Sequence, residues 1–183
     1  MKRSTGLVLV GAVCALGLAS SASAQWVFLG GGLTIPMADF KDDAKAGWVA
    51  TGGVGYDLSA NVFIAGEAWY GSNKHKGTSG DKTNLLGATG VIGYNFSPAS
   101  KASPYVLAGA GMLQHKYVPA TGTSESETKL AVTGAAGVVI GMSDKIRLFI
   151  EGRGLTTLDS DYKTFVVPIT AGVIISFGSG GGN

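Results

Sequence analysis

The sequence predicts an all-β protein, an eight-stranded antiparallel up-and-down transmembrane β-barrel, from three observations. Strand-like segments carry apolar residues on one face and ionisable residues on the other, their connections alternate between short and long, and aromatic residues lie near both strand ends. Charge is also scarce: Asp, Glu, Lys and Arg make up 14% of the chain, against about 25% in a typical soluble domain. No run after residue 25 is long and apolar enough for a membrane helix, so a closed barrel is the remaining way to satisfy backbone groups in lipid.

The segment 145–157 shows the periodicity most clearly. Its apolar face carries Ile146, Leu148 and Ile150. Its other face carries three ionisable residues, Arg147, Glu151 and Arg153. Successive side chains of a strand point to opposite sides of the sheet. A soluble strand would place the charged face in water, whereas a transmembrane barrel places apolar side chains toward lipid and polar ones in the lumen.

Eight segments have strand character, and single-chain outer-membrane barrels have an even number of strands. The expected strands span residues 25–35, 47–58, 61–72, 84–96, 104–117, 127–141, 145–157 and 165–177. Short connections are expected at residues 59–60, 97–103 and 143–144. Longer and more polar connections are expected at residues 36–46, 73–83, 118–126 and 159–164. This alternation indicates short periplasmic turns on one rim and longer external loops on the other.

Most strands show a consistent apolar face. In four of them it carries Trp48, Val54, Tyr56 and Leu58; Val62, Ile64 and Tyr70; Leu86, Ile92, Tyr94 and Phe96; and Leu130, Val132, Val138 and Ile140. Two strands are weaker. The segment 25–35 is interrupted by glycines at 30–32, and the run VLAGAGML in the segment 104–117 barely alternates. There, only Tyr105 and Tyr117 indicate that the odd positions face outward.

Aromatic residues near the strand ends predict two girdles, because amphipathic rings sit well at the level of lipid headgroups. The expected periplasmic girdle contains Tyr56, Tyr94, Phe96, Tyr105 and Phe177. The expected external girdle contains Trp48, Tyr70, Tyr117 and Phe165. A general preference of aromatic residues for strands explains their presence but not their position at both ends.

The first 24 residues have the layout of a secretory signal peptide: a basic start, an apolar stretch and small residues at 22–24. We therefore expect a signal peptide at 1–24, the barrel at 25–177 and a short Gly-rich tail at 178–183. Two of the 14 Lys and Arg residues lie in the signal, which leaves 12 against 12 Asp and Glu. This balance predicts no nucleic-acid partner. The one cysteine, Cys14, would leave with the signal, so no disulfide is expected.

Four stretches carry a family resemblance: GYDLSANVFIAGEAWY (55–70), SPYVLAGAGM (103–112), IRLFIEGRG (146–154) and VVPITAGVIISF (166–177). They resemble the bacterial small outer-membrane β-barrel family, which contains the outer membrane protein A transmembrane domain and opacity-type surface proteins. The resemblance implies a cell outer membrane location and a monomer. It also implies recognition by the barrel-assembly machinery through the alternating residues Val173, Ile175 and Phe177. In the family pattern the aromatic residue ends the chain, whereas GSGGGN follows it here.

The inward faces carry a lumenal polar set, Asp57, Glu67, Arg147, Glu151 and Arg153. An eight-stranded barrel is only wide enough for side chains to fill, so these charges must pair and hydrogen-bond or cost several kcal/mol each. We expect one ion pair, Asp57 with Arg147, toward the periplasmic end. We expect a second, Glu67 with Arg153, toward the external end, with Glu151 joining the arginines. This arrangement indicates a polar filling of the lumen rather than a catalytic site.

The connection after the segment 61–72 carries a lysine cluster, Lys74, Lys76 and Lys82. Clustered lysines are attracted to anionic surfaces, so contact with the phosphates of lipopolysaccharide is expected, with a solvated loop as the alternative. His75 and His115 match no zinc spacing, and we interpret them as a loop and an interface histidine. No catalytic residue, cofactor or metal is predicted.

The composition and pattern favour a structural role at the cell surface: membrane integrity, with loops that contact lipopolysaccharide, outer-membrane lipids or a host surface. A narrow channel for small solutes is the first alternative, and a lipid A-modifying enzyme is the second. A soluble periplasmic barrel with an apolar ligand inside would need polar outer faces, and the strands offer too few charges for that.

Overall fold

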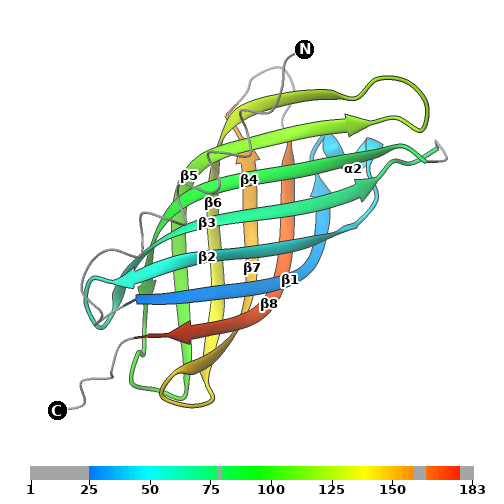
Figure 1. Ribbon diagram of the computed structural model, residues 1–183. Coiled ribbons are helices and arrows are strands. Elements are labelled where there is room, and N and C mark those ends of the chain that lie inside the picture. Colours follow the sequence, from blue (N-terminus) through cyan, green and yellow to red (C-terminus); the bar gives the residue numbers. More distant parts are fainter. Residues whose placement is uncertain (1–24, 78–79, 159–163, 178–183) are drawn as a thin grey trace.

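The computed structural model describes residues 25–77, 80–158 and 164–177. The chain forms a closed antiparallel barrel in which each strand pairs with its sequence neighbours and β8 pairs with β1 (Figure 1). The strands are β1 (Gln25–Met37), β2 (Gly47–Asp57), β3 (Val62–Lys74), β4 (Lys82–Asn95), β5 (Ala102–Val118), β6 (Glu125–Gly141), β7 (Ile146–Thr157) and β8 (Phe165–Ser176). The predicted fold class is confirmed. The expected signal peptide and Gly-rich tail lie outside the described residues.

The strand bounds lie within two residues of those predicted. The β2–β3, β4–β5 and β6–β7 connections lie at one end of the barrel, here called the turn end. The opposite ends of the strands form the other rim of the barrel, here called the loop end. The β1–β2 connection at the loop end contains a short helix, α2 (Phe40–Asp43), that no periodicity in the sequence indicates. No helix in the described residues is long and apolar enough to cross a membrane.

Apolar side chains lie on the outside of the barrel and charged ones lie inside, as predicted for a transmembrane barrel. In β7, Ile150 is 56% exposed on the outside, whereas Glu151 and Arg153 are 6% and 9% exposed in the interior. Large apolar side chains also cover the outside of the other strands, among them Leu29, Leu33, Trp48, Ile64, Ile92, Leu130, Ile169 and Val173. Apolar residues outside and charged residues inside are the arrangement of a lipid-facing barrel.

The outward aromatic side chains gather near both ends. Near the loop end, Trp48 and Tyr70 lie with ring centroids 5.5 Å apart. Near the turn end, Tyr94 and Phe96 lie with ring centroids 5.2 Å apart. These positions suit the interfacial girdles expected of a membrane barrel.

The orientation predicted for β5 is wrong. Tyr105 is 6% exposed and points into the lumen, whereas Val106 and Met112, 41% and 49% exposed, point outward. Tyr105 therefore does not belong to the turn-end girdle. The prediction failed because the glycines and alanines between these residues show no preference for either face. Tyr117 shares the inward parity, and its hydroxyl donates to Asp81 Oδ2 at 2.7 Å.

Inward-facing glycines make room for aromatic rings in the lumen. A Cβ atom at Gly55 would lie 2.1 Å from the Trp26 ring, and one at Gly93 would lie 2.0 Å from the Phe63 ring. Both distances are far below van der Waals contact, so no larger residue fits without moving the ring. The abundance of glycine in this chain is thus partly explained by the space that the aromatic side chains need.

Candidate functional site

Two glutamates and one arginine meet in the lumen near the middle of β3 and β7. Arg153 Nη2 donates to Glu67 Oε2 at 2.9 Å, Arg153 Nε donates to Glu151 Oε1 at 2.9 Å, and Arg153 Nη1 donates to Glu67 Oε1. Thr89 Oγ1 donates to Glu67 Oε1 at 2.6 Å, and the Tyr105 hydroxyl donates to Glu151 Oε2 at 2.8 Å. Every carboxylate oxygen of this acid–arginine triad (Glu67, Glu151, Arg153) thus accepts a hydrogen bond, which buried ions require.

The ion pair expected between Asp57 and Arg147 is not formed; none between them occurs in the described part of the chain. Trp26 Nε1 donates to Asp57 Oδ1 at 2.9 Å, and Arg147 Nη2 donates to Ser176 Oγ at 3.2 Å. Each charged group takes a partner from an adjacent strand, because β2 pairs with β1, and β7 with β8. The two residues lie toward the same end of the barrel, but this does not determine which side chains bond to each other.

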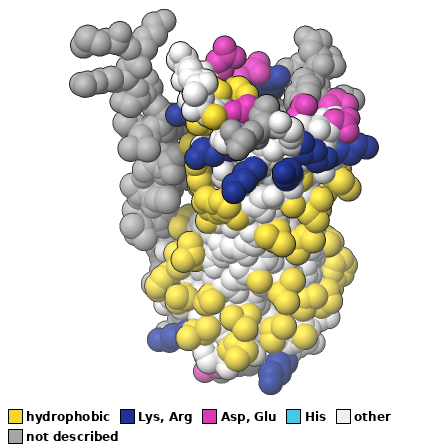
Figure 2. All heavy atoms as spheres, turned by 90° about the vertical axis from the view of Figure 1, so that its right-hand side faces the viewer, with side chains coloured by type: hydrophobic (Ala, Val, Ile, Leu, Met, Phe, Trp, Pro, Cys, Tyr) yellow, Lys and Arg dark blue, Asp and Glu magenta, His cyan; other side chains and the backbone are white. Residues whose placement is uncertain are grey.

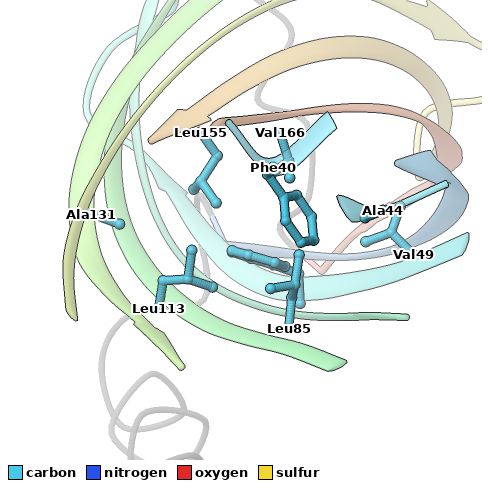
Figure 3. Packing of buried hydrophobic residues seen from close by; sticks show 9 residues of the cluster. Phe40, Ala44, Val49, Leu85, Leu113, Ala131, Leu155 and Val166 are labelled. Carbon is cyan, nitrogen blue, oxygen red and sulfur yellow. The ribbon is translucent and has the colours of Figure 1, made fainter. Parts of the chain in front are cut away.

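The loop-end half of the lumen is filled with apolar side chains. Phe40 of α2 is 3% exposed and points into the barrel between side chains of several strands (Figure 3). The cluster, here called the loop-end plug, consists of Phe40, Ala44, Val49, Trp69, Leu85, Leu113, Ala131, Leu155 and Val166. No periodicity marks Phe40 in the sequence, because it stands in the polar connection 36–46. The plug closes the lumen at the loop end.

The turn-end half of the lumen contains a cavity of about 550 Å³. Six aromatic residues line it. Five of them form a row with neighbouring ring centroids 5.8 to 6.2 Å apart, in the order Tyr105, Phe63, Trp26, Phe28 and Phe149, and Trp69 is the sixth. Asn61 and Pro98 of the turns also line the cavity, so it reaches the turn end. The triad and Trp69 border it on the side of the loop-end plug. We call this space the turn-end cavity.

Both histidines line one pocket of about 200 Å³ at the loop end. His75 Nε2 lies 2.7 Å from Thr83 Oγ1, and the His115 ring centroid lies 6.4 Å from that of Phe40. The interpretation of His115 as an interface residue is wrong, because the odd positions of β5 face inward. Among the described residues, no group of three or more His, Cys, Asp and Glu could hold a metal ion.

The lysines predicted to bind anions lie at the loop end, outside the barrel. Lys74 and Lys82 are exposed and directly opposite each other across β3 and β4. The exposed Lys116 of β5 lies beside them, because Asn84 of β4 pairs with it. The predicted member Lys76 is also exposed, but its Nζ donates to the Lys41 carbonyl oxygen at 2.6 Å. Lys116 was not predicted, because the orientation of β5 was misassigned.

Lys74, Lys82 and Lys116 lie at the loop-end termini of their strands: β3 ends at Lys74, β4 begins at Lys82, and Lys116 stands two residues before the end of β5. Figure 2 shows apolar side chains over the barrel wall, Lys and Arg side chains gathered above this band, and acidic side chains nearer the rim. We call Lys74, Lys82 and Lys116 the basic patch. It lies where apolar wall gives way to polar connections, the level at which a membrane barrel meets lipid headgroups.

The three residues proposed as an assembly signal share one face at the end of the described chain. Val173, Ile175 and Phe177 are 37%, 43% and 61% exposed. They face outward, next to the closing seam between β8 and β1.

The sequence matches the family described as "Outer membrane protein beta-barrel domain" over residues 5–174. Neisserial surface protein A has the same fold, with 16% identity, coverage of 86% of this chain and 100% of that chain, and a TM-score of 0.68. OprG from Pseudomonas aeruginosa is 12% identical, with coverage of 87% and 99% and a TM-score of 0.58. Ail of Yersinia pestis is 16% identical, with coverage of 84% and 99% and a TM-score of 0.53.

No curated protein sequence matches the chain. The family match covers most of the sequence, and the solved barrels share its fold. The chain therefore belongs to the outer membrane protein β-barrel family and is a protein of the bacterial outer membrane.

Proposed function

We propose that this barrel has a structural role at the cell surface and holds lipopolysaccharide through its basic patch. The observation that carries the proposal is the position of three exposed lysines on adjacent strands, directly beyond the apolar wall. Lipopolysaccharide phosphates lie at this level of the outer leaflet when the loop end faces outward. Clustered lysines attract anionic headgroups by about 1 kcal/mol each.

The neighbouring side chains favour this reading. Tyr70 and Trp48 lie on the outer face of β3 and β2, near the loop end, where they contact the acyl-chain and headgroup boundary. Ser72 Oγ donates to Asn84 Oδ1 at 2.8 Å on the strands that carry the patch. The patch therefore combines a polar surface with an aromatic border, which suits the phosphorylated sugar and acyl chains of one amphipathic lipid.

A relative of the same fold offers a parallel for anion binding at the surface. Ail of Yersinia pestis, 17% identical to this chain, has been solved in complex with the heparin analogue sucrose octasulfate at a TM-score of 0.54. That ligand is a small polyanion, as is the phosphorylated core of lipopolysaccharide. The parallel supports the ligand class, while the position of the patch rests on this chain's own lysines.

Charge reversal at the patch tests the proposal. The triple variant Lys74→Glu, Lys82→Glu and Lys116→Glu should copurify with several-fold less lipopolysaccharide per barrel, measured by a sugar assay after extraction in mild detergent. The control reverses Lys101 and Lys145, which are exposed at the turn end. Heat-modifiable migration on a detergent gel verifies that both variants are folded. Equal lipopolysaccharide content in the two folded variants would contradict the proposal.

A further inference from the structure

The turn-end cavity carries an excess of negative charge. The triad contributes two carboxylates and one guanidinium, and Asp57 and Arg147, which also line the cavity, offset each other. With all five groups ionised, the described lining has a net charge of minus one. A buried charge without a counter-charge costs several kcal/mol. A cation inside the cavity would remove that cost.

The walls of the cavity also favour a cation. Aromatic faces carry negative partial charge and attract cations within about 6 Å of the ring centroid. Trp26, Phe63 and Tyr105 line the cavity as a row of neighbouring rings, with centroids 5.8 and 6.2 Å apart. The same rings bury alkyl groups, so a cation with an apolar body fits them better than a hydrated metal ion.

The closed end of the cavity is packed around Trp69. This residue is 5% exposed, and its Nε1–H has no hydrogen-bond partner among the described residues. A buried donor without a partner costs about 1–3 kcal/mol. Trp69 stands on β3 one inward position beyond Glu67, at the closed end of the cavity. This nitrogen is fully shielded from the cavity, so it marks the packed closed end and offers no contact to a ligand.

Access and size agree with a small ligand. The cavity reaches the turn end through Asn61 and Pro98 and is closed by the loop-end plug. Its volume of about 550 Å³ lies within the range of small-molecule sites. We propose that the turn-end cavity binds a small organic cation, an alkylammonium, from the periplasmic side. The ammonium group lies against the aromatic rings and the carboxylates of the triad.

A matched pair of probes tests the charge requirement in a barrel whose cavity lining is unaltered. Choline and 3,3-dimethylbutan-1-ol share shape and hydroxyl group and differ in charge. The Trp48→Phe variant leaves Trp26 and Trp69, which line the cavity, as the remaining tryptophans of three. We expect choline to change their fluorescence with an affinity at least about tenfold higher than that of the alcohol. Equal affinities, or no change with either probe, would overturn the proposal.

A charge variant provides the second test. Glu151→Gln keeps the shape of the side chain and removes the excess charge, so choline affinity should fall about tenfold toward that of the alcohol. The control is Glu127→Gln, because Glu127 has 67% of its side chain exposed at the loop end and does not line this cavity. Unchanged choline affinity in folded Glu151→Gln would also overturn the proposal. If that variant does not fold, the comparison of the two probes in Trp48→Phe decides.

Discussion

The two halves of the lumen are built from inward-facing positions of the same strands, yet they are filled differently. In the loop-end half, Phe40 from the β1–β2 connection packs among side chains of the strands and completes the plug. In the turn-end half, six aromatic residues, including Trp69 of the plug, line a cavity of about 550 Å³. Side-chain size does not explain the difference, because the larger residues line the open half.

The difference lies in what enters the barrel at each end. The β1–β2 connection is long enough to form α2 and to place Phe40 inside the lumen. The connection between β2 and β3 spans only residues 58–61, too few to fold inward. The lumen is therefore closed at the loop end by an inserted side chain and open at the turn end. We call this arrangement the cup.

The largest expected effect comes from the triad that separates the two halves. Arg153→Gln leaves Glu67 and Glu151 buried without a counter-charge, and we expect a loss of about 3–5 kcal/mol in the free energy of unfolding. Urea titration of the folded barrel in micelles, read from heat-modifiable migration, measures this loss. The control Arg147→Gln should cost far less. Equal stability of wild type and Arg153→Gln would show that the triad does not hold the two halves together.

The plug offers the next effect. Phe40→Ala removes a ring that is 3% exposed and should cost about 3 kcal/mol. It should also convert the cup into a conducting tube, which single-channel recording in planar bilayers detects as a larger and steadier current. The control is Phe96→Ala, since Phe96 is 55% exposed on the outside. A high conductance of the wild type, unchanged by Phe40→Ala, would instead favour the narrow-channel alternative.

A glycine substitution tests the aromatic lining. Gly93→Ala should force the Phe63 ring to move, since the added Cβ would lie 2.0 Å from it, and should cost about 1–3 kcal/mol. Gly90→Ala is the matched control in the same strand, because nothing lies within 4 Å of a Cβ there. Both variants are compared by urea titration. If Gly93→Ala and Gly90→Ala destabilise the barrel equally, the packing of the Phe63 ring does not require a glycine at position 93.

The smallest effect is expected at the open mouth of the cup. Asp57→Asn keeps an oxygen that accepts from Trp26 Nε1, and Arg147→Gln removes one hydrogen bond to Ser176. Both side chains are partly exposed, so water replaces what is lost and each change should cost under about 1 kcal/mol. A loss as large as that of Arg153→Gln would mean that Asp57 and Arg147 are shielded from water as much as the triad is.

The strands and the triad could be predicted from the sequence, because both depend on local alternation. Ile150 and Glu151 differ in polarity at adjacent positions, so their faces follow directly from the period of two. Glu67 and Arg153 could be placed at one level because each lies toward the same end of its strand. The orientation of β5 could not be predicted, since glycine and alanine fit either face.

The plug and the partners of Asp57 depend on three-dimensional neighbours that the sequence pattern does not show. Phe40 stands among charged residues in a connection, and only the fold of α2 places it in the lumen. Asp57 bonds with Trp26 because β1 and β2 are adjacent, whereas the prediction considered only its level. To predict which side chains bond to each other, one needs the strand register as well as the face on which each residue lies.

The most direct test of the cup compares two alanines of the lumen. Ala65 lines the turn-end cavity, and Ala131 is 1% exposed in the loop-end plug. The barrel segment contains no cysteine, since Cys14 is the only one in the chain. In micelles, a small water-soluble thiol reagent should label Ala65→Cys many times faster than Ala131→Cys. Equal labelling rates, or faster labelling of Ala131→Cys, would contradict a lumen that is open at the turn end and closed at the loop end.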